Sequence, residues 1–390
     1  WHFVPQPQNL VETEVTQRDQ FRNDEVDLSD TIVREAVQNS LDAATGNSQQ
    51  VKVRFRWING SDGLSSDFMN QLFEGHLDHA HSAGIELDEI DFASPSALII
   101  EDFGTRGLTG AVDYKDDDNF TDFWRRHGRS HKTGRSRGRW GLGKLVYSSC
   151  SLLSSFFGIT VRDGDPFQYL MGQTVLGFHK HDGIEYPAHA FFSELSGDNT
   201  NIQIQVPVRD NGFTATFCRN FGMERQDHSG LSIASPFPNP ELKLDNMIAV
   251  GIVNYFYPII TGQLVLEFND IQIDSANIRD LANRYAKGKI SDIDLLFDFI
   301  GEVNNTPDSD LLVLKERWVG DNRLDEDDFE PEDLEKIREK FASKEIVGIN
   351  LPLRIKHKTK GESQTSFSVY VKRPEELSKG HDMYVRGGLT

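Results

Sequence analysis

The chain has 390 residues and a formal net charge of -20, with 37% hydrophobic and 26% charged residues. This length exceeds the size at which one hydrophobic core usually stops growing, so we expect two domains. No apolar run approaches the roughly 20 residues that span a bilayer, and the acidic balance excludes a protein that coats nucleic acid through bulk electrostatics. Cys150 and Cys218 are too few for a disulfide framework, and the first ten residues lack a signal-peptide pattern, so we expect a soluble cytoplasmic protein without membrane contact.

The first predicted element is a helix over residues 30 to 44, DTIVREAVQNSLDAA, with Asp27 or Ser29 as its N-cap. At 100° per residue, three polar side chains fall within about 60° of one another on this helix: Glu35, Asn39 and Asp42. Such a face could hold Mg²⁺ through oxygen ligands and position a water. The alternative is an ordinary solvated helix face.

A glycine turn follows the second predicted strand. VKVRFRW at 51 to 57 alternates like a strand, and ALII at 97 to 100 leads directly into EDFGTRGL. Asp102 comes off this strand end and could accept a hydrogen bond from the amino group of a purine. Gly104 and Gly107 would let the backbone approach a flat ligand. Without other motifs, a strand followed by a turn is the simpler interpretation.

A basic segment and a second glycine motif come next. Residues 125 to 139 carry seven Lys or Arg and no acid. GRWGLGK at 138 to 144 almost matches a phosphate-binding P-loop, but Leu145 stands where that loop needs a Ser or Thr, and no apolar strand precedes it. Its glycines still offer backbone N–H groups to an anion at the start of a helix predicted over 144 to 157.

Further strands predict an α+β fold with helices packed on one sheet face. The expected strands are FGITVRD, FQYLMGQTVLGF, NIQIQVPV, GLSIASPFP and LVLEF, with a helix over 246 to 262 before the last of them. A second unit begins near residue 275. It contains a solvated helix with Pro331 near its first position and the strands LPLRIKH and SFSVYVK.

Taken together and in order, three motifs resemble those of the GHKL ATPase superfamily, which includes gyrase B subunits, ninety-kilodalton heat-shock chaperones, MutL, MORC ATPases and histidine kinases. EAVQNSLDA resembles its N box, EDFGTRG its first glycine box and GRWGLGK its second. The style is nearest to MORC-like, MutL-like or uncharacterised bacterial GHKL proteins. The resemblance implies a Bergerat-type two-layer α/β sandwich over 1–275 and a smaller, transducer-like α/β domain over 276–390.

The resemblance also implies a role for each matching residue. Glu35 would be the general base that activates water, Asn39 would coordinate Mg²⁺, and Asp42 would support the site. Asp102 would bind the adenine amino group, with Gly104 and Gly107 shaping its pocket. Thr105 and Arg106 separate these two glycines more widely than in the usual box, which leaves the role of Gly107 open.

The remaining implied site residues lie further along the chain. Residues 108 to 137 would form a lid over ATP, and Ser232 would stand near the adenine where the family has Thr. Lys144 could contact a phosphate or only cap the helix. The phosphates would be wrapped by three glycines: Gly138, Gly141 and Gly143. In gyrase-like members a second domain adds a cation, for which the candidates are Lys356, Lys358, Lys360 and Arg386, although a solvated basic loop is the alternative for each.

These features predict a Mg²⁺-dependent ATPase whose slow hydrolysis drives lid closure and homodimerisation, so that the ATP state controls a protein partner. A DNA-linked process such as repair or phage defence is a hypothesis, with nucleic acid bound by the basic segment from Arg125 to Arg139. The rival is a nucleotide sensor that binds without turnover, and a P-loop NTPase ranks third. HLDHAH, with His76, His79 and His81, is a weak zinc pattern, and we expect Cys150 to be a buried small apolar residue.

Overall fold

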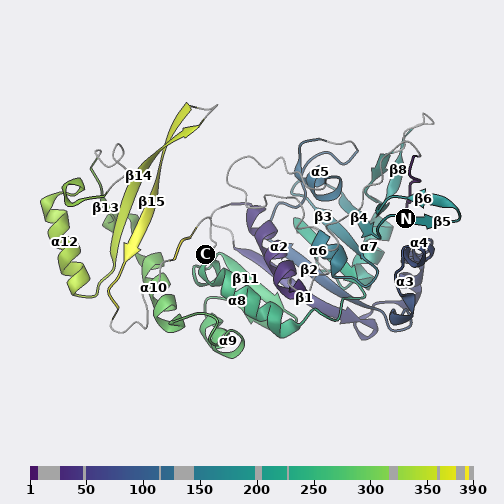
Figure 1. The fold of residues 1–390 in the computed structure, drawn as a ribbon, viewed down its shortest axis with the longest axis horizontal. Coiled ribbons are helices and arrows are strands. Elements are labelled where there is room, and N and C mark those ends of the chain that lie inside the picture. Colours follow the sequence, from purple (N-terminus) through teal and green to yellow (C-terminus); the bar gives the residue numbers. More distant parts are fainter. Residues whose placement is uncertain are drawn as a thin grey trace. The chain divides into compact units, whose positions relative to one another are not determined.

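The computed structural model describes residues 1–7, 27–46, 50–113, 116–126, 145–197, 204–225, 228–315, 324–357, 361–374 and 383–385. The chain divides into two compact units, Trp1–Ala286 and Lys287–Thr390 (Figure 1). The division falls after helix α9 (Ile278–Tyr285), beyond the boundary near 275 expected from the sequence. Helix α9 packs against α8 (Leu244–Ile260) and buries Ile278 and Ala282, so it completes the first unit.

The first unit is built on a large mixed sheet that is mostly antiparallel, with the strand order β12-β11-β1-β2-β10-β3-β4-β7. Among its described strand pairs only β1 and β11 run parallel. Its strands are β1 (Val51–Asn59), β2 (Ser96–Phe103), β3 (Ser155–Val161), β4 (Gln168–Val175), β7 (His189–Phe192), β10 (Gly230–Pro236), β11 (Leu264–Phe268) and β12 (Ile271–Ile273). Two small hairpins complete it: β5 (His179–His181) with β6 (Ile184–Tyr186), and β8 (Glu194–Ser196) with β9 (Ile204–Val206).

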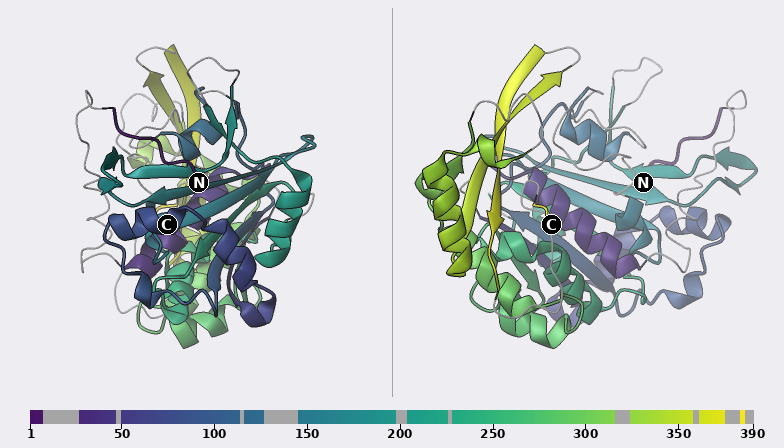
Figure 2. Two further views of the ribbon diagram at one scale, coloured as in Figure 1. Left: turned by 90° about the vertical axis from the view of Figure 1, so that its right-hand side faces the viewer. Right: turned by 60° about the vertical axis from the view of Figure 1, so that its left-hand side comes forward.

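One face of the sheet is covered by α2 (Leu28–Asp42), α6 (Leu145–Ser149) and α8, and Figure 2 shows α2 lying along it. Asp27 is the N-cap of α2, because its side chain accepts hydrogen bonds from the backbone N–H of Ser29 and Asp30. The helix turns Ile32, Val33, Ala36 and Val37 inward. Its polar face is thereby directed away from the core, as the apolar spacing predicts.

The opposite face is also covered, so the expectation that helices pack on one face only, in two layers, is wrong. Helices α3 (Ser66–Leu72), α4 (His76–Ser82) and α7 (Asn211–Asn220) pack there through a large core cluster. Met69, Phe73 and Phe217 meet Ile99 and Phe157 of the central strands in this cluster. Strands β2, β3 and β10 are buried almost throughout, and a strand buried on both sides needs a layer on each.

A second difference concerns the predicted helix over 144 to 157. Helix α6 has only five residues, and strand β3 begins at Ser155. Ser154 adopts a φ of 49°, which no helix contains, and the Ser151 hydroxyl donates to Pro236 O at 2.6 Å. Serine side chains that bond to the backbone compete with helical hydrogen bonds. Cys150, at the end of this turn, is buried as expected.

The second unit combines helices with a three-stranded sheet of order β13-β14-β15. Its elements are α10 (Ile293–Asn305), β13 (Leu312–Val313), α12 (Pro331–Ala342), β14 (Val347–His357) and β15 (Gly361–Val371). Pro331 occupies the start of α12, where its missing N–H costs nothing. A small core forms around Leu314, Phe329 and Val347. Within the described part of the chain, no helix is long and apolar enough to cross a membrane.

Candidate functional site

Helix α2 brings two of the expected site residues into direct contact. Asn39 Nδ2 donates a hydrogen bond to Glu35 Oε1 at 2.8 Å. Both side chains are partly exposed, so solvent or a ligand can reach them. The amide N–H group points toward the Glu35 carboxylate, so the carbonyl oxygen of the same amide points away from it. An amide oxygen beside a carboxylate is a donor set that suits Mg²⁺.

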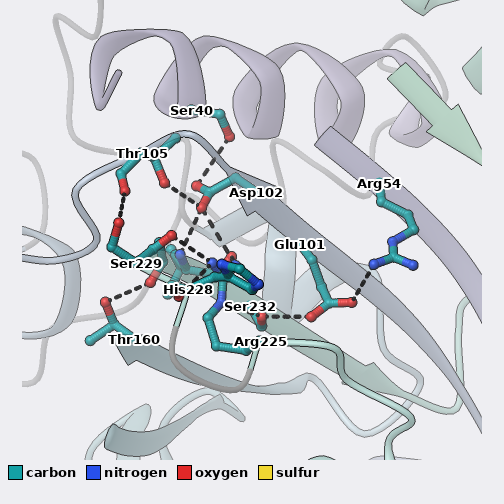
Figure 3. A network of polar contacts seen from close by, with 12 residues as sticks. Ser40, Arg54, Glu101, Asp102, Thr105, Thr160, Arg225, His228, Ser229 and Ser232 are labelled. Carbon is teal, nitrogen blue, oxygen red and sulfur yellow. Dashed lines mark hydrogen bonds and ion pairs between the residues drawn. The ribbon is translucent and has the colours of Figure 1, made fainter. Parts of the chain in front are cut away.

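Asp102 lies at the end of β2, against α2, at the centre of a polar network (Figure 3). Its Oδ1 accepts hydrogen bonds from Thr105 Oγ1 at 2.6 Å and from the backbone N–H of Leu231 at 2.7 Å. Arg225 Nη2 lies 3.6 Å from the same oxygen. This side of the buried carboxylate is thus fully occupied by protein donors.

The other oxygen of Asp102 is different. Oδ2 faces Ser40 of α2, whose Oγ lies 3.3 Å away. The same hydroxyl lies 2.8 Å from Ala36 O. A serine hydroxyl has a single hydrogen, and the shorter contact to Ala36 takes it. Asp102 therefore keeps one oxygen as an acceptor that a ligand N–H group can use.

The glycines after Asp102 are required by close backbone approaches. Gly104 and Gly107 have positive φ angles of 78° and 70°, and a Cβ on either would lie 2.4 Å from a backbone oxygen, that of Gln50 or of Val161. The role of Gly107 that the sequence left open therefore includes a steric one. It lets the turn sit against β3, where Leu108 N donates to Thr160 Oγ1 at 2.9 Å.

Tyr147 of α6 belongs to this site, although the sequence gave no reason to select it. Its hydroxyl hydrogen bonds with the Asn39 side chain, and its neighbours include the carboxylates of Glu35 and Asp102. Burial, followed by the negative charge of Glu35, raises the pKa of Tyr147 above its ordinary value. The hydroxyl is therefore protonated at neutral pH. Its burial and its contact with Asn39 depend on the packing of α6 against α2, which the sequence does not show.

Two further predicted site residues, Asp42 and Ser232, make contacts outside the Asn39–Glu35 pair and the Asp102 acceptor oxygen. Asp42 is partly buried at the end of α2, and its backbone carbonyl accepts a 2.6 Å hydrogen bond from Arg106. Ser232 pairs with Glu101 across β2 and β10, and its hydroxyl donates to Glu101 Oε1 at 3.0 Å. Because neighbouring residues of a strand point to opposite faces, Ser232 faces away from the α2 side of the sheet. The structure does not bring it to the acceptor oxygen of Asp102.

The residues expected to bind the ATP phosphates lie outside the described residues: Gly138, Gly141, Gly143 and Lys144. The lid expected over 108 to 137 is described only up to residue 126, apart from residues 114 and 115. There, α5 (Asn119–Trp124) is anchored in the core, since Trp124 stacks on Phe156 with ring centroids 5.5 Å apart. Arg125 donates to the carbonyls of Val112 and Gln205, so it is already engaged within the fold.

The other candidates are also accounted for. In the second unit, Lys356 forms an ion pair with Glu362 at 3.1 Å, while Lys358, Lys360 and Arg386 lie outside the described residues. The histidines of HLDHAH do not converge. His76 Nε2 lies 3.0 Å from Thr174 Oγ1, His79 Nδ1 lies 2.9 Å from His179 Nε2, and His81 is exposed. Among the described residues, no group of three metal-ligating side chains was found.

Comparisons with known proteins give a fold likeness and no family. No family model matches the chain, and no curated protein matches it. Two solved structures of the ATPase region of Saccharomyces cerevisiae topoisomerase II, one of them bound to ICRF-187 (dexrazoxane), each match with 10% identity and a TM-score of 0.29. They cover 65% and 67% of this chain and 51% and 52% of those chains, so the chain spans about half their length. At this identity and TM-score the likeness supplies no residue correspondence.

Proposed function

We propose that the first unit binds ATP and Mg²⁺ between α2 and the end of β2 and hydrolyses the nucleotide slowly. The observation that carries this proposal is that the two oxygens of the Asp102 carboxylate have different partners. Oδ1 is held by Thr105 and Leu231, while Oδ2 remains an acceptor beside α2. The exocyclic amino group of adenine supplies the N–H that this oxygen can accept.

Glu35 is the general base in this proposal. Its carboxylate is partly exposed and is oriented by the Asn39 amide, as a group that removes a proton from an attacking water must be. The side-chain oxygen of Asn39 would hold Mg²⁺, with Asp42 supporting the site. When bound, Mg²⁺ would supply charge neutralisation at the phosphate oxygens.

The rest of the proposal extends to residues that the sequence motifs select. Gly138, Gly141, Gly143 and Lys144 would wrap the phosphates, and the segment beyond Trp124 would close over them as a lid. Dimerisation in the ATP state would convert binding into a switch that acts on a protein partner. Hydrolysis then resets the switch instead of serving metabolism.

Asp102→Asn tests the base site. The amide oxygen must stay on the side of Thr105 and Leu231, which donate to it, so the amide NH₂ would face the N–H of the ligand. Hydrogen bonds to charged groups contribute about 1.5–3 kcal/mol, so we expect ATP affinity, measured by calorimetry, to fall about tenfold or more. Asp163→Asn, at an exposed position before β4, is the matched control and should leave affinity unchanged. Unaltered binding in Asp102→Asn would remove the adenine role.

A nucleotide sensor without turnover is the alternative, because the contacts of Asp102 would hold the base equally well in a protein that does not hydrolyse ATP. Phosphate release followed over hours separates the two functions. Turnover that is lost in Glu35→Gln supports the ATPase. Saturable ATP binding with no phosphate release above that of the Glu35→Gln protein supports the sensor.

A DNA-linked role would depend on the basic segment from Arg125 to Arg139. Arg125 and Arg126 serve the fold, since Arg126 pairs with Asp117 and Asp122 at 2.5 and 3.0 Å. Nucleic acid would therefore be bound by the basic residues after them. Reversing Arg129, Lys132 and Arg135 to Glu should abolish the stimulation by DNA, measured as the ratio of turnover with DNA to turnover without it. Absence of any DNA binding or stimulation in the parent protein would end this part of the proposal.

A further inference from the structure

Arg225 lies directly behind Asp102, in the loop before β10, and is fully buried with 0% exposure. Its guanidinium is saturated with protein acceptors (Figure 3). Nε donates to Ser232 Oγ at 3.0 Å, Nη1 to Ser229 O at 2.9 Å and Nη2 to Leu231 O at 2.7 Å. One side chain thus fixes the start of β10, the strand whose Leu231 N–H holds Asp102.

The charge of Arg225 is also directed at Asp102. Nη2 lies 3.6 Å from Oδ1, and Gly230 makes this approach possible. Gly230 has a φ of 139°, and a Cβ there would lie 2.2 Å from Arg225 Nη1 and 2.4 Å from Asp102 Oδ1. Burial lowers the pKa of the guanidinium and the nearby Asp102 acts against this. An arginine side chain remains charged in proteins.

Burying a cation costs several kcal/mol before its partners offset that cost, so a saturated, fully buried arginine is weak evidence for stability. It is better evidence for a fixed geometry. A second arginine of the network, Arg54, provides the contrast. Its guanidinium lies 5.4 Å from the centre of the Phe103 ring, against 4.9 Å for Arg225, but Arg54 pairs with Glu101 and Glu224. Among the described residues, no hydrogen bond or ion pair between Arg54 and Asp102 was found.

We propose that Arg225 is a positioning residue that determines base specificity, by holding Oδ1 of Asp102 so that Oδ2 faces the ligand as a hydrogen-bond acceptor. This inference rests on the proposed function. A 6-aminopurine offers an N–H to Oδ2, whereas a 6-oxopurine places a second acceptor against it and leaves both unpaired. Sites that hydrogen-bond one ligand reject the analogue that lacks the matching group.

Nucleotide titrations of four proteins test this inference: the parent, Arg225→Met, Arg225→Lys and Arg54→Met. Each is titrated with ATP and with inosine triphosphate, and its unfolding is measured in urea. In the parent we expect ATP to bind about tenfold or more tightly than inosine triphosphate. Without the guanidinium, the start of β10 and its Leu231 N–H are no longer fixed and Oδ1 loses its charged neighbour. The Arg225→Met protein should therefore lose about tenfold in ATP affinity and most of the preference.

Arg54→Met is the matched control, since it also removes a buried cation from this network. It should lose stability but retain the parent's preference for ATP. Arg225→Lys keeps the charge and should recover part of the preference. If Arg225→Met does not fold, Arg225→Lys is compared with Arg54→Lys, and only the former should weaken the preference.

The two levels of the proposal fail separately. Suppose that the parent protein prefers ATP. The role of Arg225 is then overturned if Arg225→Met keeps the same preference, or if Arg54→Met weakens the preference as much as Arg225→Met does. Either result leaves the proposed function standing. A parent protein that binds neither nucleotide overturns both.

Discussion

Asn39 donates a hydrogen bond to the carboxylate of Glu35 one turn earlier on α2, at 2.8 Å. The i, i+4 spacing places the two side chains on the same helix face, where such pairs meet. The amide therefore fixes the orientation of the carboxylate before any ligand arrives. In the proposed ATPase this contact sets the direction in which Glu35 accepts a proton.

Glu35→Gln should separate catalysis from binding. Glutamine has nearly the same shape but cannot act as a base, so we expect phosphate release to fall about 100-fold or more, as removal of a general base typically does. ATP affinity, measured by calorimetry, should stay within about threefold of the parent. Asp30→Asn on the solvent side of the same helix is the control. Undiminished turnover in Glu35→Gln would assign the base elsewhere.

Tyr147→Phe tests whether the buried hydroxyl positions Asn39. Loss of a single hydrogen bond should cost about 1 kcal/mol of unfolding free energy. If the hydroxyl orients the Asn39–Glu35 pair, kcat should also fall several-fold with KM little changed. Tyr169→Phe removes another tyrosine hydrogen bond, that to Asp165 at 2.9 Å, away from the site. The hypothesis fails if both variants lose stability and neither loses turnover.

The local part of the site could be predicted from the sequence. Helical periodicity placed Glu35 and Asn39 on one face, and the apolar run before Asp102 placed this carboxylate at a strand end. Both inferences use contacts within a few residues. The strands FGITVRD, LVLEF and LPLRIKH were confirmed for the same reason, since each carries its own pattern.

Contacts that depend on strand register could not be predicted. Ser232 was selected by its position in GLSIAS, but the pairing of β10 with β2 sets Ser232 beside Glu101 and gives Asp102 the N–H of Leu231. A shift by one residue would reverse these faces. Arg225 gave no signal, because an arginine in a polar loop is ordinarily exposed. Its burial is caused by the strand ends that surround it.

Trp124→Ala tests the anchoring of α5. Trp124 stacks on Phe156 and fills the space above Gly158, where a Cβ would lie 2.9 Å from its ring. Removing so large a buried side chain should cost about 3–5 kcal/mol in urea unfolding. Phe167→Ala, at a site 42% exposed, should cost much less. A small loss in Trp124→Ala would mean that α5 moves with the proposed lid and is not part of its fixed base.

His76 should make the first unit sensitive to mild acid. Burial lowers its pKa from 6.5 to about 3, and its Nε2 lies 3.0 Å from both Thr174 Oγ1 and Ser155 Oγ. Below pH 6.5 the unfolded chain takes up a proton at this position and the folded chain does not. The free energy of unfolding therefore falls as the pH drops from about 6.5 toward 3, by up to about 1.4 kcal/mol per pH unit.

His76→Gln isolates this contribution, because glutamine can hydrogen-bond but does not titrate. Urea unfolding at several values between pH 7.5 and 5 should show the variant less stable than the parent at pH 7.5, with the difference shrinking as the pH falls. His81→Gln, at an exposed position on the same helix, controls for the His-to-Gln substitution itself. Parallel curves for His76→Gln would mean that the folded chain protonates His76 as readily as the unfolded one, contrary to its burial.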